Sequence, residues 1–550
     1  MPSTTSRPST ASSTNPARDS RSIDLEKLSS SQLGGPPNTQ PPNDGGDVDL
    51  EKQKQDLPTR PTTLLSQTRS HRSIAGGDGY TIFPADAGDG DTAPHDYVVT
   101  WEGGDSDPLN PRSMSKLRRW VIVIIVSSSS LSVTCASSLY TTTYSQMIPR
   151  FHTSREIATL GLSLFVAGLG LGPMVLSPLS EFYGRRPIYI YSFLFFLIWL
   201  IPCAVAPNIA TMLVGRFLSG LSGSAFLSVA GGTVGDIFAK QDFPFIGPEV
   251  GPLIGGFITQ YTTWRWSFYV LLIWAGVQLG AIFFLVPETY HPVLLRQKAQ
   301  RLRKETRNEA WKAPIENLSR SIPKTILWSC IRPFQLLFFE PMCLNLCMLS
   351  AILLGILYLF FGAFPLVFQN NHGFSIAQTG LTFLGMFVGM VLGILSDPLW
   401  RRNYARLVRQ REAHGGEPGG SEPEYRLPPT IVGAFVVPIA LFGFGWTTYP
   451  WRHLGLLGRL YVPRRLRQSV THVQYPVYAA SALAANSFAR SSFAAAFPLF
   501  GVQMYNNLGY QWATSLLAFL ALAMAPFPIL FYRYGKRLRG NSRFASSTTG

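Results

Sequence analysis

Residues 181–186 read Glu-Phe-Tyr-Gly-Arg-Arg, and residues 397–402 read Asp-Pro-Leu-Trp-Arg-Arg. In both segments an acidic residue is followed at the fourth and fifth positions by two arginines, and each segment ends the second long apolar run of its half of the chain. Gly393 precedes the second acid by four residues, and Ser177 occupies the matching position before the first. Two copies at equivalent places predict two parallel halves with the same order of elements.

The composition of the whole chain excludes an ordinary soluble protein. Of its 550 residues, 46% are apolar and only 14% are charged, whereas soluble domains carry about 25% charged residues. The net charge of +16 comes from short basic clusters between long apolar runs, which is typical of a membrane protein and not of a nucleic-acid-binding face. Cys343 and Cys347 lie one helical turn apart without an accompanying histidine, so we expect packing residues and no metal site.

Apolar runs of membrane-spanning length follow one another from Trp120 onward. A bilayer core about 30 Å thick needs roughly 20 apolar residues of helix. Eleven runs come near this length, six before a basic stretch at 288–333 and five after it. The predicted spans are 119–140, 157–180, 187–206, 209–232, 243–260, 266–286, 341–367, 375–396, 428–447, 477–501 and 511–532.

The distribution of lysine and arginine orients these spans. Cytoplasmic loops carry an excess of basic residues, and the basic clusters of this chain predict that both termini are cytoplasmic. The N-terminal segment is rich in Ser, Thr, Pro, Gly and Asp and has no apolar periodicity, which predicts disorder. The expected organisation is a disordered cytoplasmic tail at 1–99, a six-span half at 100–287, a cytoplasmic central loop at 288–333, a second half with six expected spans at 334–540 and a cytoplasmic tail at 541–550.

Several segments carry a resemblance to a known family. Residues 177–188 resemble the loop motif Gly-x-x-x-Asp-x-x-Gly-Arg-Arg/Lys of the major facilitator superfamily, with Ser177 in place of glycine and Glu181 in place of aspartate. Residues 216–220 resemble its fourth-span motif, and residues 247–256 resemble the fifth-span motif that marks antiporters. Segments 101–111 and 287–295 are similar to fungal members. The chain therefore resembles a fungal twelve-span drug:proton antiporter of this superfamily.

This resemblance implies an all-α polytopic membrane protein of the major facilitator fold, with two parallel six-span halves. It also implies secondary active efflux of apolar drugs or fungal toxic metabolites in exchange for protons, by a monomer in the plasma membrane. The partners are then a small-molecule substrate, protons and the lipid bilayer, with no cofactor. We expect a transporter and not an enzyme. The chain has no Walker A sequence, so we do not expect ATP to drive the transport. Proton-coupled uptake of a small nutrient and a non-transporting membrane remnant stay open as alternatives.

Charged side chains inside membrane spans are costly and are therefore functional candidates. Arg216, Glu249 and Arg490 meet this condition as candidates for proton coupling or substrate contact. The family ties the arginine of its fourth-span motif to proton coupling, and the resemblance carries this role to Arg216. Glu249 lies between Pro248 and Gly251, where a disrupted helix would expose its carboxylate to a cavity. For Glu249 and Arg490 a structural ion pair is the alternative.

The repeated segments bring acids and arginines to the cytoplasmic ends of spans. Carboxylate–guanidinium pairs there would stabilise the outward-facing state and break when the cytoplasmic side opens. Simple anchoring by positive charge is the alternative, but it accounts for the arginines and not for the acids at a fixed offset. The predicted cytoplasmic latch comprises Glu181, Arg185, Arg186 and Asp236, mirrored by Asp397, Arg401 and Arg402.

Glycines recur at four-residue intervals along one face of two spans. Small residues at this spacing let two helix backbones approach closely, and in the family fold the fifth and eighth spans face each other across the halves. We expect the two spans to slide along each other at these glycines. We expect a similar contact between the second span and the span at 477–501, which is the eleventh in the family fold. Tight packing within each half is the alternative. The seam residues are Gly247, Gly251 and Gly255 with Gly385, Gly389 and Gly393, and Gly168 and Gly172 repeat the spacing on the second span.

The first span is unusually polar, since 12 of the 19 residues from Ser127 to Ser145 are Ser or Thr. Such a face usually lines a water-filled cavity, although these hydroxyls can also bond to their own helix. On the seventh span an aromatic group offers a stacking surface for apolar drugs, with lipid contact or packing as the alternative for each ring. The group comprises Tyr358, Phe360, Phe361 and Phe364.

Two segments depart from the family pattern. The fifth span is short and broken by prolines, which a small deletion at 236–245 would explain. Residues 451–475, where the tenth span is expected, hold five arginines, and burying them at about 2.5–3.5 kcal/mol each would cost more than about 12 kcal/mol. This segment cannot span a bilayer. We therefore expect a twelve-span functional protein and a faulty gene sequence or damaged allele at this point.

Overall fold

Helices account for almost all of the regular secondary structure in the computed structural model of the protein. The structure describes residues 97–101, 104–238, 250–317, 322–415, 422–448 and 479–540, all within the unit Leu65–Gly550. In these ranges the β pairing consists of one isolated bridge between Val98 and Lys312. The prediction of an all-α protein is confirmed for the described part of the chain.

The helices follow one another in the order that the two predicted halves require. The first half holds α1 (Lys116–Leu139), α2 (Tyr144–Phe151), α3 (Arg155–Tyr183), α4 (Arg185–Ala204), α5 (Ile209–Gly223), α6 (Ala225–Ile237), α7 (Val250–Tyr261) and α8 (Trp264–Leu285). The connection holds α9 (His291–Thr306) and α10 (Ile322–Phe339). The second half holds α11 (Pro341–Pro365), α12 (Ile376–Leu395), α13 (Asp397–Ala413), α14 (Pro428–Trp446), α16 (Ala479–Ala523) and α17 (Pro526–Gly540).

Polar residues directly before the apolar runs begin several of these helices. Ser115, Ser154 and Asn208 each accept a hydrogen bond from the backbone N–H three residues further on, at 3.4, 3.4 and 2.8 Å. Ser375 and Gln378 form a reciprocal capping box at the start of α12. Each cap satisfies a backbone donor that the helix leaves unpaired, which is worth about 1 kcal/mol.

Two glycines with positive φ end helices where the sequence predicts a new span. Gly184 has a φ of 99° and separates α3 from α4. Gly509 has a φ of 76° and breaks α16 into two helices. Glycine adopts this conformation without the steric cost that a Cβ adds. The break at Gly509 divides the predicted spans 477–501 and 511–532.

Nine stretches of helix in the described residues are long and apolar enough to cross a membrane. They contain ten of the predicted spans, because Ala484–Gly535 holds the last two. The remaining predicted span, 243–260, is the fifth in the chain. It is described only from Val250 onward, as the 12-residue helix α7. Residues 451–475 and most of 236–245, where the sequence departs from the family pattern, lie outside the described residues.

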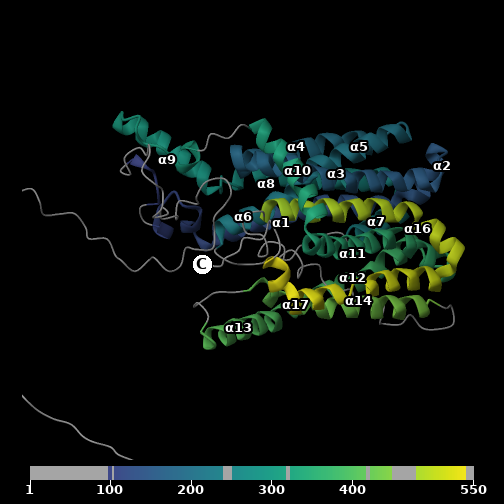
Figure 1. Ribbon diagram of the computed structural model, residues 1–550. Coiled ribbons are helices and arrows are strands. Elements are labelled where there is room, and N and C mark those ends of the chain that lie inside the picture. Colours follow the sequence, from purple (N-terminus) through teal and green to yellow (C-terminus); the bar gives the residue numbers. More distant parts are fainter. Residues whose placement is uncertain are drawn as a thin grey trace, which may run out of the picture. The chain divides into compact units, whose positions relative to one another are not determined.

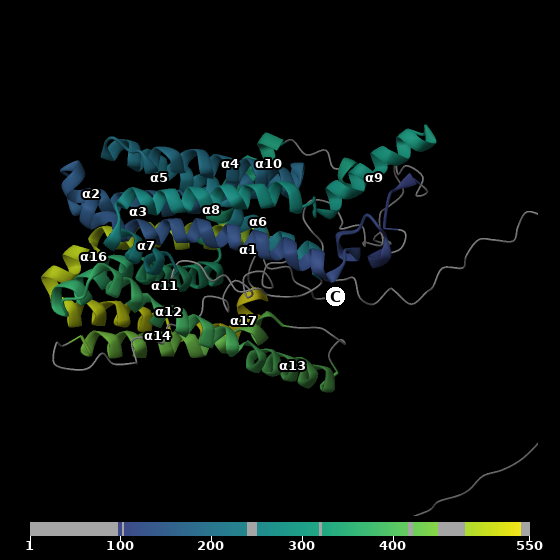
Figure 2. The same cartoon turned by 180° about the vertical axis from the view of Figure 1, so that it is seen from behind.

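The helices of the two halves form two groups, with α1, α7 and the first part of α16 running between them (Figures 1 and 2). Within the first half, α5 packs against α3 and α4, and α8 packs against α4. Within the second half, α16 packs against α11 and α14. The halves meet where α7 contacts α12 and α3 contacts α16, and α10 contacts α3, α11 and α16. One continuous apolar core extends through both halves.

Candidate functional site

Arg216 lies on α5 and its side chain is fully buried, with 0% of its surface exposed. Its Nη1 donates to the carbonyl oxygen of Ala136 at 2.8 Å, and its Nη2 donates to that of Ser137 at 3.4 Å. Its Nε donates to the carbonyl oxygen of Gly161 on α3 at 3.4 Å. Helix carbonyls of α1 and α3 therefore hold the guanidinium from two sides.

Two aromatic rings complete the surroundings of this cation. The guanidinium carbon of Arg216 lies 4.4 Å from the ring centre of Tyr140 and 4.2 Å from that of Phe165. Ring faces attract cations, most strongly where water is excluded. Among the described residues, no carboxylate lies within ion-pairing distance of Arg216. The charge is held by carbonyl dipoles and ring faces.

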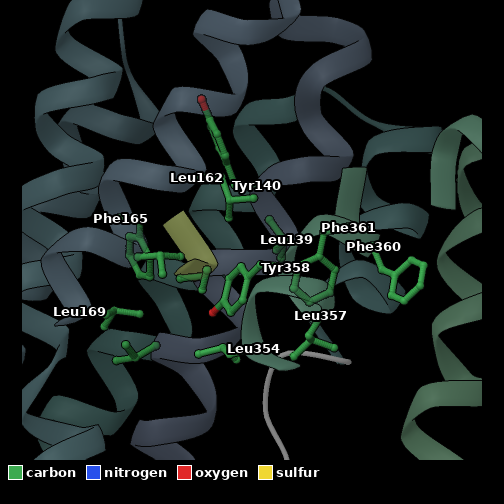
Figure 3. Packing of buried hydrophobic residues seen from close by; sticks show 14 of the residues in the cluster. Leu139, Tyr140, Leu162, Phe165, Leu169, Leu354, Leu357, Tyr358, Phe360 and Phe361 are labelled. Atoms are coloured by element: carbon green, nitrogen blue, oxygen red, sulfur yellow. The ribbon is translucent and has the colours of Figure 1, made fainter. Parts of the chain in front are cut away.

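The apolar side chains next to this cation come from both halves. Figure 3 shows Leu139, Leu162 and Phe165 of the first half beside Leu357 and Tyr358 of α11. The Tyr358 hydroxyl lies 3.1 Å from the Ser137 hydroxyl. The region around Arg216 is therefore the place where the first-half core meets α11.

At the first copy of the repeated segment, the structure brings Arg185 and Asp236 together. The Arg185 Nε lies 3.3 Å from an Asp236 carboxylate oxygen, so the start of α4 is tied to the end of α6. Arg185 also donates to the Ser180 hydroxyl at 2.7 Å and lies 4.6 Å from the ring centre of Tyr290. Glu181, at the end of α3, is close enough to interact electrostatically with Arg185.

Glu288 lies beside Arg185, although no pattern in the sequence predicted a role for it. Its carboxylate accepts hydrogen bonds from the backbone N–H groups of Arg185 at 2.9 Å and Arg186 at 3.1 Å. It also accepts from the N–H of Tyr290 at 2.9 Å. A carboxylate at a helix N-terminus satisfies free donors and complements the helix dipole, so Glu288 caps α4 from a position about a hundred residues away in the chain. In the sequence, the segment 287–295, which contains Glu288, showed only a similarity to fungal members of the superfamily.

The second copy of the segment is built differently. Asp397 and Arg401 form an ion pair at 2.6 Å within α13, where the Arg401 side chain is 56% exposed. Exposed pairs of this spacing contribute about 0.3–0.5 kcal/mol. Arg402 is exposed on the same helix. In the described residues the second copy therefore does not mirror the helix-to-helix pair of Arg185 and Asp236.

The glycine seam lies at other positions than the spacing predicts. A Cβ added at Gly251 or Gly255 would contact α1 or the turn after it, at Ser138 and Thr142, within the first half. The fifth and eighth spans instead approach at Gly256 and Gly380, because a Cβ on Gly380 would lie 2.7 Å from the Pro252 carbonyl oxygen. Tight packing within one half, the alternative considered above, describes Gly251 and Gly255.

The other predicted seam glycines divide in the same way. Gly168 and Gly172 face α5 in the first half, whereas Gly170 faces Ser491 of α16 across the halves, with 2.5 Å from an added Cβ to the serine Cβ. Gly385 and Gly389 are buried on α12 and Gly393 is half-buried. Gly168 and Gly172 therefore pack within the first half, as the alternative to the seam had it.

Of the other two charged candidates, Arg490 lies within the described residues and Glu249 does not. Arg490 lies on α16, half-buried and next to the Ser491 that faces Gly170. Glu249 and Gly247 fall outside the described residues. Arg490 thus follows in sequence next to a residue at the boundary between the halves, whereas Arg216 is held by carbonyls of α1 and α3.

The hydroxyls of the first span bond mainly to their own helix. Ser129, Ser132, Thr134, Ser137, Ser138, Thr141, Thr142 and Thr143 each donate to a carbonyl oxygen three or four residues earlier, at 2.6–3.4 Å. All but Thr142 are buried. Most of these hydroxyls therefore find their hydrogen-bond partner within their own span. These contacts correspond to the alternative of bonds within the helix and not to a face that lines a water-filled cavity.

The aromatic group of the seventh span packs against other rings. Phe361 and Phe364 lie 5.4 and 4.8 Å from the ring centre of Phe383 on α12. Phe360 and Phe364 lie 5.6 and 5.5 Å from that of Phe444 on α14. These contacts correspond to the packing alternative for the three phenylalanines. Among the described residues, no group of three His, Cys, Asp or Glu side chains is placed to hold a metal ion.

Known proteins with similar sequences agree with this architecture. The sequence model of the Major Facilitator Superfamily matches residues 126–462, more than half of the chain. The efflux pump atB of Aspergillus terreus is 51% identical over 470 residues, which are 82% of this chain and 90% of the relative. The probable drug/proton antiporter YHK8 of Saccharomyces cerevisiae is 39% identical over the same shares of the two chains. The efflux pump FUB11 of Gibberella moniliformis is 39% identical over 463 residues, 80% of this chain and 76% of the relative.

The family model and these relatives, together with the bundle of apolar helices, define the protein as a secondary transporter. The chain belongs to the major facilitator superfamily. The predicted fold and the predicted multi-pass membrane character are confirmed.

Proposed function

We propose that this protein exports apolar small molecules, drugs or toxic metabolites of the producing organism, in exchange for protons. The curated relatives named above are efflux pumps and a probable drug/proton antiporter, which confirms the efflux class predicted from the sequence. The observation that carries the mechanism is Arg216, a buried guanidinium held by carbonyls of α1 and α3. Burying a permanent charge in an apolar bundle costs free energy, which makes this arginine a candidate for a functional role.

The latch supplies the second part of the proposal. Arg185, Asp236 and Glu288 join α4, α6 and the start of the central connection at one end of the first half. We assign this end to the cytoplasm, with both termini on that side and the protein acting as a monomer in the plasma membrane. Opening of this end would break the contacts that Arg185 makes with Asp236 and Glu288, and water would then solvate the separated charged groups.

Drug accumulation in a yeast strain that lacks its own pumps tests the function. Cells expressing the full chain should accumulate less of a fluorescent apolar drug than cells expressing Arg216→Ala, with equal amounts of both proteins in the plasma membrane. Greater accumulation than in empty cells would indicate uptake instead. No difference from empty cells, with the protein present in the membrane, would indicate a remnant that does not transport.

A proton gradient experiment tests the energy source. In right-side-out vesicles loaded with drug, an acidic exterior should accelerate efflux, and a protonophore should remove the acceleration. Efflux that ignores both treatments would contradict proton exchange while leaving export itself established. The experiment at acidic external pH therefore tests whether protons drive the transport, independently of the direction in which the drug moves.

A further inference from the structure

Ser137 on α1 makes contacts toward both halves of the protein. Its carbonyl oxygen accepts from Arg216, and its hydroxyl donates to the Thr134 carbonyl oxygen at 2.7 Å. Since that proton is already used, the Tyr358 hydroxyl donates to the Ser137 hydroxyl across 3.1 Å. Figure 3 shows the Tyr358 ring directed from α11 toward the first-half side chains, with its oxygen on that side. One serine thus connects the buried cation with α11.

The surroundings of this hydroxyl pair are apolar. Tyr358 is 4% exposed and packs edge-on against Phe361, whose ring centre lies 5.3 Å away. Leu139 and Leu162 are 2% and 1% exposed. When the two halves separate at this level, both hydroxyls lose a partner in a dry environment, which costs free energy until water or substrate enters. The contact therefore favours the closed arrangement.

Other hydrogen bonds between the halves lie near helix ends. The backbone N–H of Ala377, at the start of α12, donates to the Gln260 side chain, near the end of α7, at 2.7 Å. Glu156 at the start of α3 lies close to the Gln503 side chain of α16. Both contacts lie at the end of the bundle opposite Arg185 and Asp236, since α3 and α12 begin there and α7 ends there. The Ser137–Tyr358 bond lies away from the ends of the continuous helical stretches Lys116–Phe151 and Pro341–Asn371.

We propose that Tyr358 is a positioning residue for Arg216. Its hydroxyl fixes Ser137 while the halves are closed at this level, and so fixes the α1 carbonyls that hold the guanidinium. When α11 moves away, Ser137 is released and the carbonyl cradle of Arg216 loosens. The state of the second half is thereby communicated to the buried cation of the first. This inference rests on the proposed function, because it describes how the exchange of protons and substrate is coupled.

Removal of the hydroxyl alone tests the inference. Tyr358→Phe keeps the ring, and Tyr505→Phe is the matched control, because Tyr505 is also buried and bonds to Thr514 within the second half at 2.9 Å. We expect Tyr358→Phe to flatten the pH dependence of efflux and to lower proton-driven efflux roughly tenfold, the loss of about one hydrogen bond. Tyr505→Phe should keep the parental pH profile. An unchanged profile in Tyr358→Phe, or equal flattening in both variants, would overturn the inference.

The serine provides a second variant if Tyr358→Phe does not reach the membrane. Ser137→Ala should reproduce the flattened profile, whereas Ser132→Ala should not, because the Ser132 hydroxyl bonds to the Ser129 carbonyl of its own helix. The double variant Tyr358→Phe/Ser137→Ala should be no worse than either single variant. Additive losses would mean that the two hydroxyls act separately, against the inference.

A cross-linking experiment separates this inference from the proposed function. In a chain whose five native cysteines are serine, the pair Ser137→Cys/Tyr358→Cys is treated in membranes with a short bis-thiosulfonate reagent, because the observed contact is made by the tip of the tyrosine ring and a cysteine at 358 is too short for a direct disulfide. The protein is then cleaved by trypsin in the central connection. The two halves should stay joined on a non-reducing gel, and the pair Ser132→Cys/Tyr358→Cys should not join them. Failure of the first pair to link would overturn the inference whatever the chain transports. Linkage in a chain that exports nothing would support the contact and contradict the proposed function.

Discussion

Arg216 illustrates how a single residue can keep a charge inside an apolar bundle without a carboxylate among the described residues. Three backbone carbonyls and two ring faces surround its guanidinium. Each helix carbonyl already accepts from an amide, so the cation adds a second donor to groups that keep a free lone pair. The planar fork of arginine reaches carbonyls on two helices at once, which a lysine ammonium cannot do.

A lysine at this position should therefore fail although it keeps the charge. We expect Arg216→Lys to lose proton-driven efflux at least roughly tenfold, since one or more charge-assisted hydrogen bonds of about 1.5–3 kcal/mol disappear. Efflux from vesicles at fixed membrane content measures this loss. Arg155→Lys, at the start of α3, is the control. Parental efflux in Arg216→Lys would show that only the charge matters.

Glu249 is the residue for which a titration is proposed. The described parts of the predicted spans hold no Asp or Glu, so Glu249, which the sequence places in the predicted span 243–260, is the carboxyl group that we propose for exchange. A carboxyl group that alternates between a dry and a wet environment changes its proton affinity. We expect Glu249→Gln to uncouple efflux from the pH gradient and to weaken export of cations more than of neutral drugs. Parental rate and pH dependence would assign the coupling acid elsewhere.

At the scale of elements, the latch joins one helix start, one helix end and the beginning of the central connection. Gly184 gives α4 no side-chain cap, and Glu288 supplies the cap from outside. A Cβ on Gly184 would collide with the Glu288 carboxylate, and the φ of 99° adds to the cost for any other residue. The glycine and the glutamate are therefore a matched pair.

Neutralising this cap should loosen the start of α4. We expect Glu288→Gln to lower the thermal midpoint of the purified protein and to reduce efflux, by the equivalent of about 1 kcal/mol for a weakened cap. Glu305→Gln, on the exposed side of α9, should change neither. Equal behaviour of the two variants would mean that the charge of Glu288 does not stabilise the latch.

The contact between α7 and α12 gives a second prediction at this scale. Gly380→Val would place a side chain against the Pro252 carbonyl, 2.7 Å from the Cβ position, and push the two helices apart. We expect loss of efflux with normal membrane content, because the halves can no longer close along this line. Gly280→Val on α8 is the control, since no atom lies within 4 Å of its added Cβ. Comparable efflux in the two variants would contradict a moving contact at Gly380.

At the scale of the whole molecule, the sequence predicted the fold more completely than the site. Apolar runs identified the spans because each helix must satisfy its own backbone in lipid. The repeated acid–arginine segments identified parallel halves, yet they did not reveal that the first copy pairs between helices and the second within one. Facing directions failed in the same way at Gly251 and Gly255, since a four-residue period fits contacts on either neighbour.

The contacts that the sequence missed join residues far apart in the chain. Glu288 caps a helix that begins about a hundred residues earlier, and Tyr358 bonds to Ser137 at a separation of 221 residues. Neither pair has a local pattern, because each partner is an ordinary residue for its own element. Only the three-dimensional arrangement of the helices brings them together.

The segment 451–475 leads to a prediction about the whole chain. Five arginines exclude it from the bilayer, and a major facilitator protein needs a tenth span there to keep both termini on one side. We expect the transcript over 450–476 to encode an apolar segment of roughly 20 residues. Sequencing of the messenger RNA and the genomic DNA tests this. A transcript identical to the present sequence, in a chain that exports drug, would show that eleven spans suffice.

The hydroxyl bonds of α1 have a mechanical consequence. Carbonyl oxygens that accept from both an amide and a hydroxyl hold each amide less tightly, and helices with many such bonds bend more easily. Five of these bonds have their hydroxyl on α1, and three more have theirs on the turn that follows it, Tyr140–Thr143. Both segments contact α7. We therefore expect α1 to bend elastically as the two halves rock against each other, and to straighten again when the substrate has left.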